Sequence, residues 1–203
     1  MQSIDKAIDP HSKQAMLNFM RAADFSICDF TLDDILPDNE QEQSSASKKQ
    51  QAFNLGHKTS QDTIEYFKLH QESDGTQKTF ALAAPWLDTL QNGYVLVMDE
   101  MNHYLHPTLA MFMVKLFYNN QLNQQHSQLI FTTHETSLLT HEIVRRDQIW
   151  LMNKQNDGSS GLTSLLEFSA KKGENLRKRY LDGRYGGIPL TNDNMLIREI
   201  EGA

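Results

Sequence analysis

The sequence predicts an α/β fold in which a parallel sheet with flanking helices follows a small antiparallel β appendage. Two apolar segments, residues 94–98 and 128–132, have the length of buried strands. Between them, the segment after Pro107 has the apolar spacing of a helix, and proline suits the first helical turn. Strands that are joined through a helix run parallel, with a right-handed crossover. We therefore expect a boundary near residue 71, with the appendage in 1–71 and the α/β part in 72–203.

The appendage is expected to consist of one helix and three strands. Apolar residues recur at helical spacing over residues 13–23, with Ser12 as the N-cap. Weak alternation over residues 25–32 predicts a strand, and the polar segment 37–51 predicts a flexible loop. Strands are then expected at 52–58 and 63–69, joined by a hairpin turn at 59–62.

In the α/β part, a helix is expected to begin after Ser73. Its apolar face would carry Phe80, Ala84, Leu87 and Leu90, and Pro85 would kink or restart it. After the second apolar strand, the sequence predicts a short helix near Leu138. Strands at 148–152 and 162–168 would follow, separated by a glycine and serine turn at 157–161.

The bulk composition excludes several classes of protein. A formal net charge of −7 and an isoelectric point near 5.6 give no general electrostatic footprint for nucleic acid. The only cysteine, Cys28, excludes an internal disulfide. No apolar run has the length of a secretory signal or a membrane span, so we expect a cytoplasmic protein with no membrane partner.

The first candidate site residues are Asp99 and Glu100, which directly follow the strand at 94–98. Ligands bind at the carboxyl ends of strands in open α/β sheets. In P-loop ATPases, an acid in the first position holds Mg²⁺ through its water shell, and a following glutamate deprotonates the attacking water. Acidic residues also end many strands that carry no site, so the pair needs further support.

That support comes from the next strand, which ends in Thr132, Thr133 and His134. Neighbouring parallel strands would bring His134 close to Glu100, where a neutral imidazole could donate to a γ-phosphate. A third candidate is the helix start at Ser73, where a hydroxyl, free backbone N–H groups and Gly75 would form an anion site. Taken alone, His134 could be a structural histidine and Ser73 an ordinary helix cap.

The order of these three elements resembles the ATP-binding-cassette ATPases, which have a signature motif, a helix, a Walker B strand with a catalytic glutamate, a D-loop and a switch histidine. The segment Glu72-Ser73-Asp74-Gly75-Thr76-Gln77 keeps the serine and second glycine of the signature Leu-Ser-Gly-Gly-Gln but departs from it elsewhere. Together with the form D-E-x-x-x-x-L-H-P, it resembles the bacterial ATPases of the overcoming-lysogenization-defect type and their anti-phage relatives. The resemblance covers residues 72–189 and includes the segment DGRYGGIP at 182–189.

This resemblance implies part of a P-loop NTPase sheet of the ATP-binding-cassette kind, with ATP and Mg²⁺ as cofactors. It implies that Asp99 holds Mg²⁺ through water, that Glu100 is the catalytic base and that His134 is the switch. The implied nucleotide contacts are Ser73, Gly75, Thr76, and His103 and His106 of the D-loop. In the family, the signature motif of one protomer closes on ATP bound to the other, so a homodimer is implied.

The sequence has no G-x-x-x-x-G-K-[ST] phosphate-binding loop, also called Walker A. The run Gly56-His57-Lys58-Thr59 does not replace it, because it falls in the expected hairpin. We therefore expect an ATPase module that lacks its N-terminal Walker A segment and is inactive as an isolated chain. The leading hypothesis is an anti-phage defence ATPase that regulates a nuclease effector, with nucleic acid as a possible partner.

Three alternatives remain open at this stage. The first is a DNA-repair or chromosome-maintenance ATPase, although no long heptad arms are visible. The second is a catalytically inert fragment that binds an intact ATPase. The third is a zinc site built from His103, His106 and His134, which has no supporting cysteines. Arg184 and the basic residues near 171–179 could contact phosphate or simply be solvated.

Overall fold

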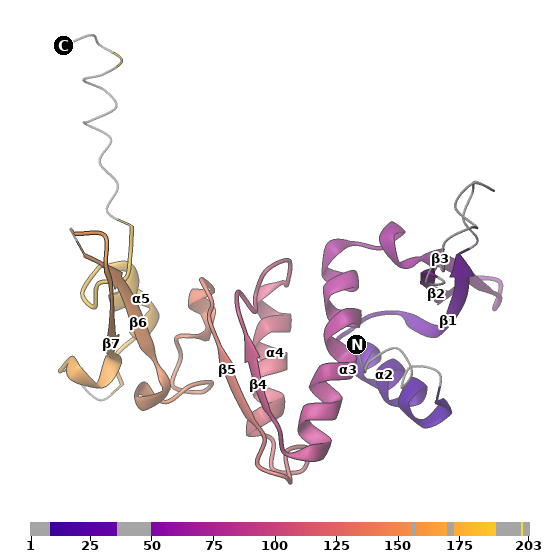
Figure 1. Cartoon of the computed structure of the whole chain (residues 1–203), viewed down its shortest axis with the longest axis horizontal. Helices are drawn as coiled ribbons and strands as arrows, with labels where there is room; N and C mark the ends of the chain where they lie inside the picture. The colour runs from indigo at the N-terminus through magenta and orange to yellow at the C-terminus, as the bar shows by residue number, and fades with distance from the viewer. Residues whose placement is uncertain (1–8, 36–49, 156, 170–172, 190–199, 201–203) are drawn as a thin grey trace, which may run out of the picture. The chain divides into compact units, whose positions relative to one another are not determined.

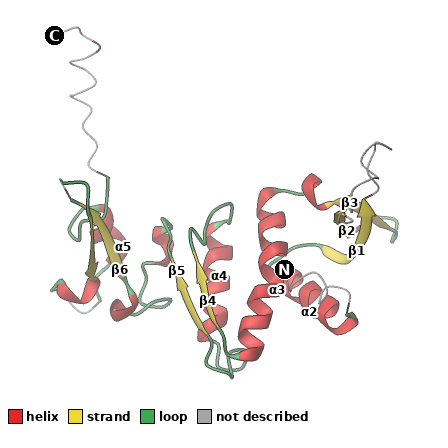
Figure 2. Ribbon diagram, viewed as in Figure 1, coloured by secondary structure: helices red, strands yellow, loops and turns green. Residues whose placement is uncertain are grey.

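The computed structural model describes residues 9–35, 50–155, 157–169, 173–189 and 200. The chain forms two compact units, residues 1–135 and 136–203. The boundary expected near residue 71 stays a prediction. Figure 1 shows the order of the elements along the chain, and Figure 2 shows which parts of it are helix, strand and loop. No helix of the described residues is long and apolar enough to cross a membrane.

The first described helix, α2 (Pro10–Ala22), begins earlier than the sequence predicted. The predicted N-cap, Ser12, is wrong because Asp9 is the cap and its carboxylate accepts the Ser12 backbone N–H at 2.9 Å. Pro10 occupies the first helical position, where its missing N–H costs nothing. One face of the helix is buried, with Met16, Leu17, Phe19 and Met20 in the core.

Three antiparallel strands follow, β1 (Ile27–Ile35), β2 (Gln50–Lys58) and β3 (Ile64–Lys68), in the order β1-β2-β3. The predicted hairpin between β2 and β3 is confirmed. The predicted loop at 37–51 lies outside the described residues except for Gln50 and Gln51, which begin β2. Gly56 is required in β2 because a Cβ there would lie 2.9 Å from the Ile64 side chain and 3.0 Å from the Tyr66 ring.

The core of the first unit lies between this sheet, α2 and the long helix α3 (Asp74–Asn92). Phe30 of β1 and Phe53 of β2 pack edge-to-face on Phe80 of α3, with ring centroids 5.2 and 5.1 Å from the Phe80 ring. Edge-to-face geometry is the favoured arrangement for aromatic pairs at these distances. The sheet is therefore attached to α3 by its apolar face.

Helix α3 is continuous through Pro85, so the predicted restart there is wrong. It ends at Gly93, whose left-handed φ of 73° suits glycine. The predicted apolar face also needs correction. Ala83 and Trp86 are fully buried with Phe80 and Leu90, whereas Ala84 and Leu87 are only half-buried. Trp86 fixes this rotation because its indole N–H donates to the Met113 carbonyl of the next helix at 3.2 Å.

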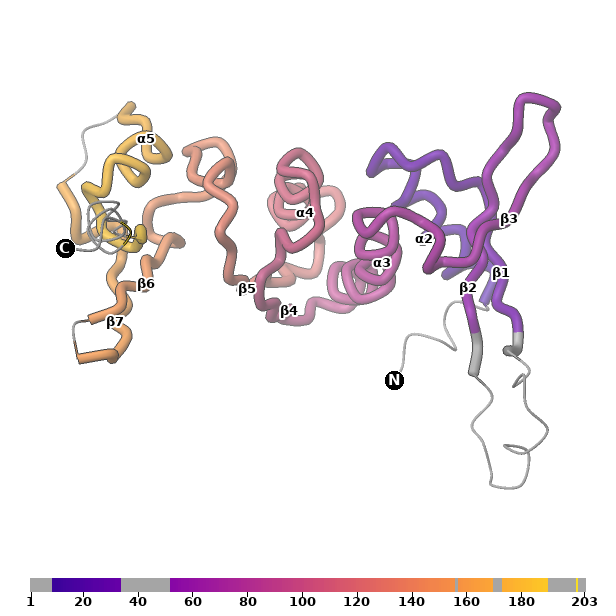
Figure 3. The backbone as a smooth tube through the Cα atoms, turned by 90° about the horizontal axis from the view of Figure 1, so that it is seen from above, coloured from indigo at the N-terminus to yellow at the C-terminus, as the bar shows by residue number. Residues whose placement is uncertain are grey.

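Strands β4 (Val95–Met98) and β5 (Gln128–Phe131) pair in parallel, and α4 (Pro107–Tyr118) connects them. The predicted strand–helix–strand unit is thus confirmed. Figure 3, seen from above, shows α4 on one side of the pair. Phe112 and Phe117 of α4 contact Phe19 and Trp86, respectively, so the apolar residues of this helix are core residues.

The prediction that β4 is a buried strand is wrong. The register pairs Val97 with Ile130, and alternate residues of the two strands point to the same side. On that side the exposed fractions are large, namely Val95 55%, Val97 70% and Ile130 55%. We call this surface the β4–β5 apolar face.

The second unit is built on an antiparallel hairpin of β6 (Trp150–Lys154) and β7 (Ser160–Ser164). Both predicted strands are shifted. Gln148 ends a 3₁₀ turn (Arg146–Gln148), and the segment predicted as a strand to residue 168 becomes a 3₁₀ turn at Leu165–Glu167. The Ser164 side chain accepts the Leu166 N–H, which starts that turn. The short helix near Leu138 is a 3₁₀ turn (Thr136–Leu138).

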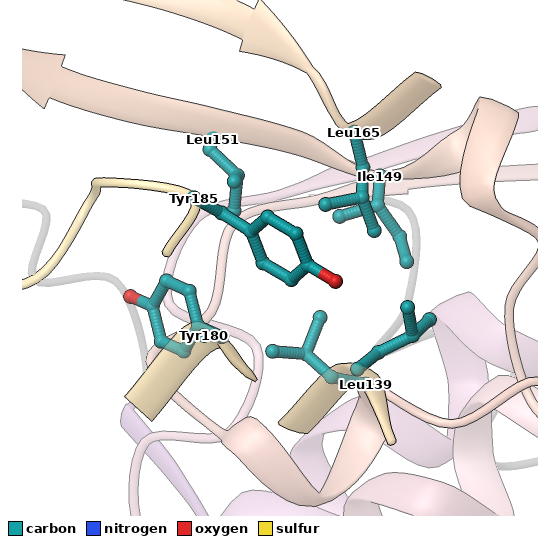
Figure 4. Close-up of a pocket in the computed structure, with 7 residues that line it drawn as sticks. Leu139, Ile149, Leu151, Leu165, Tyr180 and Tyr185 are labelled. Atoms are coloured by element: carbon teal, nitrogen blue, oxygen red, sulfur yellow. The ribbon is translucent and has the colours of Figure 1, made fainter. Parts of the chain in front are cut away.

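The glycine-rich segment at 182–189 encloses the core of this unit and follows the short helix α5 (Leu176–Leu181). Gly183, Gly186 and Gly187 all have positive φ, in line with the tight loop predicted from the sequence. Between them, Tyr185 is buried against Ile149, Leu151, Leu165 and Leu176. Figure 4 shows the Tyr185 ring at the centre of this cluster. The segment therefore has a packing role, and Arg184 lies exposed beside it.

Candidate functional site

The site is centred on the carboxyl ends of β4 and β5, where one threonine joins the two loops. The Thr132 hydroxyl donates to the Asp99 carboxylate through a short hydrogen bond. The same oxygen accepts the backbone N–H of Glu100 at 2.8 Å. A hydroxyl can donate and accept at once, so Thr132 contacts both acidic residues that the sequence singled out.

The backbone after β4 is held in an unusual conformation. Glu100 has a φ of +46°, a left-handed value that is uncommon outside glycine. The following N–H, of Met101, donates to the Thr132 carbonyl at 3.0 Å, and Met101 is fully buried. Burial of Met101 and the hydrogen bonds to Thr132 together fix this turn, which directs the Glu100 side chain outward.

Two imidazoles lie beside the Glu100 carboxylate. His103 Nδ1 is 3.4 Å from one carboxylate oxygen, and His134 Nε2 is 4.0 Å from the other. The predicted proximity of His134 to Glu100 is therefore present in the structure. Both groups are open to solvent, with side-chain exposures of 53% for Glu100 and 87% for His134. An exposed pair of this kind can bind and orient a ligand, but nothing in the described chain shields it from water.

Asn102 forms a second link between the two loops. Its side-chain oxygen accepts the Thr133 hydroxyl at 2.8 Å and the His134 backbone N–H at 3.4 Å. The Thr133 hydroxyl in turn accepts the Glu135 N–H at 3.0 Å. The loop that carries His134 is thus tied to the loop that carries Glu100. Neither Asn102 nor the hydrogen bonds of Thr132 were predicted, because only the threonine and histidine run itself is visible in the sequence.

The loop between Glu100 and α4 places the two D-loop histidines differently. His103 faces the Glu100 carboxylate and contacts the Tyr104 ring edge-to-face at 4.1 Å. His106 is the N-cap of α4, and its Nδ1 accepts the Thr108 N–H at 3.2 Å. The role of both residues as nucleotide contacts stays a prediction, and the cap gives His106 a structural role as well.

The start of α3 has the geometry of a self-contained cap. Ser73 Oγ accepts the Thr76 N–H at 3.2 Å and pairs with the Thr76 hydroxyl at 2.8 Å. Thr76 is buried, so its hydroxyl is held in place and fixes the position of the Ser73 hydroxyl. The first N–H groups of a helix have no partner within the helix itself. These N–H groups could bind an anion, although the Asp74 carboxylate beside them opposes negative charge.

The helix start and the loop after β4 lie against each other. A Cβ at Gly75 would come within 3.2 Å of the Tyr104 carbonyl oxygen. Glycine therefore allows the first turn of α3 to approach the loop that leads to α4. The start of α3, with Ser73 and Gly75, therefore adjoins the loop that carries His103 and His106.

A further contact near the start of α3 was missed by sequence reasoning. His57 Nε2 of β2 lies 2.7 Å from the carboxylate of Glu72, whose side chain is only 12% exposed. The Gln77 side chain donates to the Glu72 carbonyl at 2.8 Å. Glu72 directly precedes Ser73, so the sheet β1-β2-β3 holds the start of α3. The sequence carries no signal for this long-range pair.

The donor set fits a magnesium ion held through water better than a direct metal site. Among the described residues, no group of three or more His, Cys, Asp or Glu side chains could hold a metal ion, which removes support for the zinc alternative. Thr132 occupies one oxygen of Asp99, and the other remains available to a metal-bound water. Mg²⁺ commonly keeps several waters and takes one or two carboxylates.

The run at 56–59 is not a phosphate-binding loop in the structure either. Gly56, His57 and Lys58 lie within β2 and pair with β3, rather than joining a strand to a helix. A phosphate-binding loop requires that strand–loop–helix context. Its dismissal in the sequence is confirmed.

Comparison with known proteins identifies a family and similar solved structures. No curated protein matches the chain. A solved structure described as "Structural biochemistry of ATP-driven dimerization and DNA stimulated activation of SMC ATPases" is similar at 13% identity and a TM-score of 0.45, covering 91% of this chain and 99% of that chain. Residues 7–140 match the family described as "AAA domain, putative AbiEii toxin, Type IV TA system". This match spans the whole candidate site and confirms the expected P-loop NTPase fold of the ATP-binding-cassette kind. The chain belongs to this family of AAA-type ATPase domains.

Proposed function

We propose that this chain is the water-activating part of an ATP-hydrolysing switch. In this role Asp99 holds Mg²⁺ through a water molecule, Glu100 accepts a proton from the attacking water, and His134 contacts the γ-phosphate. Magnesium would neutralise charge on the phosphates when bound. These assignments follow the family and the chemistry of the three side chains.

The observation that carries the proposal is the convergence of the two strand ends. Glu100 and His134 come from loops 34 positions apart, yet their side chains approach to 4.0 Å. Hydrogen bonds through Thr132 and Asn102 fix that approach. A carboxylate and an imidazole held beside one another, next to a second carboxylate, suit a water molecule that must be oriented and deprotonated. An ordinary solvated strand end needs no such cross-linking.

We also propose that Ser73, Gly75 and Thr76 act on a second nucleotide, bound by another protomer. The free N–H groups at the start of α3 support an anion contact, and Thr76 holds the Ser73 hydroxyl in place. His103 and His106 lie in the loop that Gly75 approaches, so they would face the same dimer interface. A homodimer would bury the exposed Glu100 and His134 side chains, which excludes water other than the nucleophile.

The phosphate-binding loop must come from another polypeptide segment, which we propose packs on the β4–β5 apolar face. Parallel sheets are normally covered on both faces, and an exposed two-stranded pair is rarely stable. A strand–loop–helix segment would cover Val97 and Ile130 and bring a phosphate loop to the edge where Asp99 lies. The exposure of Val97 and Ile130 supports this face as the place where that segment would bind.

The closer relationship to the overcoming-lysogenization-defect ATPases, a role in anti-phage defence and a nuclease effector all belong to this proposal. They rest on the pattern E-S-D-G-T-Q, on D-E-x-x-x-x-L-H-P and on the segment DGRYGGIP. Nucleic acid could be the signal that the switch detects. Purification of the chain from its native cells, with detection of a co-purifying nuclease, tests the effector.

Two experiments test the proposed chemistry. Calorimetry with Mg-ATP should show no saturable micromolar binding by the isolated chain, because it has no phosphate loop. Co-expression with a segment that carries G-x-x-x-x-G-K-[ST], taken from the DNA upstream of the gene, should restore hydrolysis. Glu100→Gln should then lower turnover at least about 100-fold while leaving ATP binding intact. Undiminished turnover in that variant removes Glu100 from the mechanism.

A second function, an interaction module that binds an intact ATPase without hydrolysing ATP, is favoured by one observation. The β4–β5 apolar face would serve such a partner equally well, whether or not Glu100 acts. The two functions differ in the same assay. If the co-expressed complex forms but turnover does not respond to Glu100→Gln, the interaction module is correct.

A further inference from the structure

Thr132 links the ends of β4 and β5 through both its side chain and its backbone. One oxygen atom, its hydroxyl, donates to Asp99 and accepts from the backbone of Glu100. Its own backbone extends the parallel ladder, because the Thr132 N–H donates to the Met98 carbonyl at 3.0 Å. The residue is therefore rigid on the β5 side and bonded to two consecutive residues on the β4 side.

The hydroxyl compensates for an unfavourable backbone. A left-handed φ is an unfavourable backbone conformation for a residue other than glycine. Hydrogen bonds from the Glu100 N–H to the Thr132 hydroxyl and from the Met101 N–H to the Thr132 carbonyl lie on either side of this residue and help to hold its conformation. Without the hydroxyl, the turn would retain only the backbone hydrogen bond from Met101 and the burial of that methionine.

The same hydroxyl decides which oxygen of Asp99 is available. Donation to one carboxylate oxygen fixes the rotation of the carboxylate and leaves the second oxygen open. The direction of the open oxygen and the direction of Glu100 are then set by a single group. Any metal-bound water held by Asp99 and any water held by Glu100 would have a fixed separation.

We propose that Thr132 is the positioning residue of this site. Its one hydroxyl donates to the Asp99 carboxylate and accepts the Glu100 N–H, so it fixes the two acidic residues relative to each other. This inference rests on the proposed function for its catalytic consequence, but its structural part stands without it. Thr132 itself touches neither water nor nucleotide in this proposal. It acts through the two carboxylates.

The structural part is tested on the isolated chain by amide exchange measured with NMR. Thr132→Val keeps the side-chain shape and removes the hydroxyl, so the Glu100 amide should exchange about 3- to 10-fold faster, as expected for a hydrogen bond of ordinary net strength. Thr132→Ser should retain the slow rate. Thr133→Val is the matched control, because the Thr133 hydroxyl bonds to Asn102 and not to Glu100. An unchanged Glu100 amide in Thr132→Val overturns the proposal.

The catalytic part is tested in the reconstituted ATPase. Thr132→Val should lower kcat by about 10- to 100-fold with little change in KM for ATP, and Thr132→Ser should restore kcat to within about threefold. If Glu100→Gln abolishes turnover while Thr132→Val turns over like the parent, the positioning role is wrong although the proposed function holds. If Glu100→Gln has no effect, the proposed function fails, and the amide exchange result still decides the structural part.

Discussion

The two sheets of the first unit differ in the faces that they turn away from the helices. The sheet β1-β2-β3 turns a polar face outward, where Asn54 donates to Asp33 and Tyr66 donates to Asp29. The pair β4–β5 turns outward an apolar face that includes Val97 and Ile130. Both are covered on the other face by helices. We call the antiparallel sheet complete, because the face that it exposes to water is polar. We call the parallel pair incomplete, because the face that it exposes is apolar.

The difference supports the proposal that another polypeptide segment covers the β4–β5 apolar face. Antiparallel sheets commonly have one solvated face, whereas parallel sheets are covered on both faces. The acidic and histidine residues of the candidate site lie at the end of the incomplete sheet, and the complete sheet holds the start of α3 through His57 and Glu72. Substitutions in the two sheets should therefore have unequal effects on the isolated chain and on its assembly.

The largest expected effect is on the stability of the complete sheet. Phe80→Ala removes a buried ring that contacts Phe30 and Phe53, and it should lower the free energy of unfolding by about 3–5 kcal/mol. Val97→Ala, on the exposed face, should change it by less than about 0.5 kcal/mol. Urea denaturation of both variants measures the two values. Equal losses would mean that the β4–β5 apolar face is covered in solution by the chain itself.

The next effect concerns assembly. Val97→Lys places a charge on the β4–β5 apolar face without entering a core, so the isolated chain should keep its stability. Its affinity for a segment with a phosphate-binding loop should fall by about 10- to 100-fold, since an unpaired lysine would be buried. The exposed Lys58→Ala in β2 is the matched control. Titration of the segment by calorimetry decides between the variants, and normal affinity of Val97→Lys places the partner elsewhere.

A smaller effect is expected where the complete sheet holds the start of α3. His57→Ala leaves the mostly buried Glu72 carboxylate without its imidazole partner, which should cost about 1–2 kcal/mol of unfolding free energy. The double variant with Glu72→Gln should recover part of the loss, because an amide tolerates the site without a counter-charge. The single variant Glu72→Gln completes the cycle. If the loss of unfolding free energy in the double variant equals the sum of the losses in the two single variants, the two side chains are not coupled.

The elements of the fold were predicted from the sequence where the pattern is local. The strand–helix–strand unit around Pro107 and the hairpin after residue 50 have clear periodicity and turn signals, and both are confirmed. The start of α2 was missed because Asp9 and Ser12 are both good caps, and only the coordinates show that Asp9 accepts the Ser12 N–H. The sequence also missed which residues of α3 face the core. The rotation of this helix about its own axis depends on the Trp86 hydrogen bond to α4, which is a tertiary contact.

The candidate site divides in the same way. Asp99, Glu100 and His134 were found from the sequence because strand ends and side-chain chemistry identify them. The hydrogen bonds of Thr132, the contacts of Asn102 and the left-handed turn at Glu100 were not, because a hydrogen bond across 32 positions leaves no periodic signal. The exposure of β4 was missed for another reason. Continuous apolar strands are normally buried, and the sequence does not say whether the covering element is present.

The smallest expected effect on the free energy of unfolding comes from Asp29, on the polar face of the complete sheet, and it depends on pH. Partial burial alone would raise the pKa of Asp29, but hydrogen bonds from Lys13 and Tyr66, the Lys13 charge and the Phe30 N–H together hold this pKa below its ordinary value. A carboxyl group with a lowered pKa in the folded state contributes stability above its unfolded pKa. That stability is lost as the pH falls through the folded value.

Asp29→Asn should therefore cost about 0.5–1 kcal/mol at pH 6, the range of partly exposed ion pairs, and the difference from the parent should shrink towards pH 3. Urea denaturation at pH 6, 5, 4 and 3.5 measures this trend. In a Lys13→Gln background, the same substitution should show a weaker dependence on pH, because the Lys13 ammonium, 2.6 Å from the Asp29 carboxylate, is one of the groups that lower the pKa. If the loss of unfolding free energy in Asp29→Asn stays constant with pH, the charge of Asp29 does not stabilise the sheet. The outer face would then be stabilised by hydrogen bonds that do not require this charge.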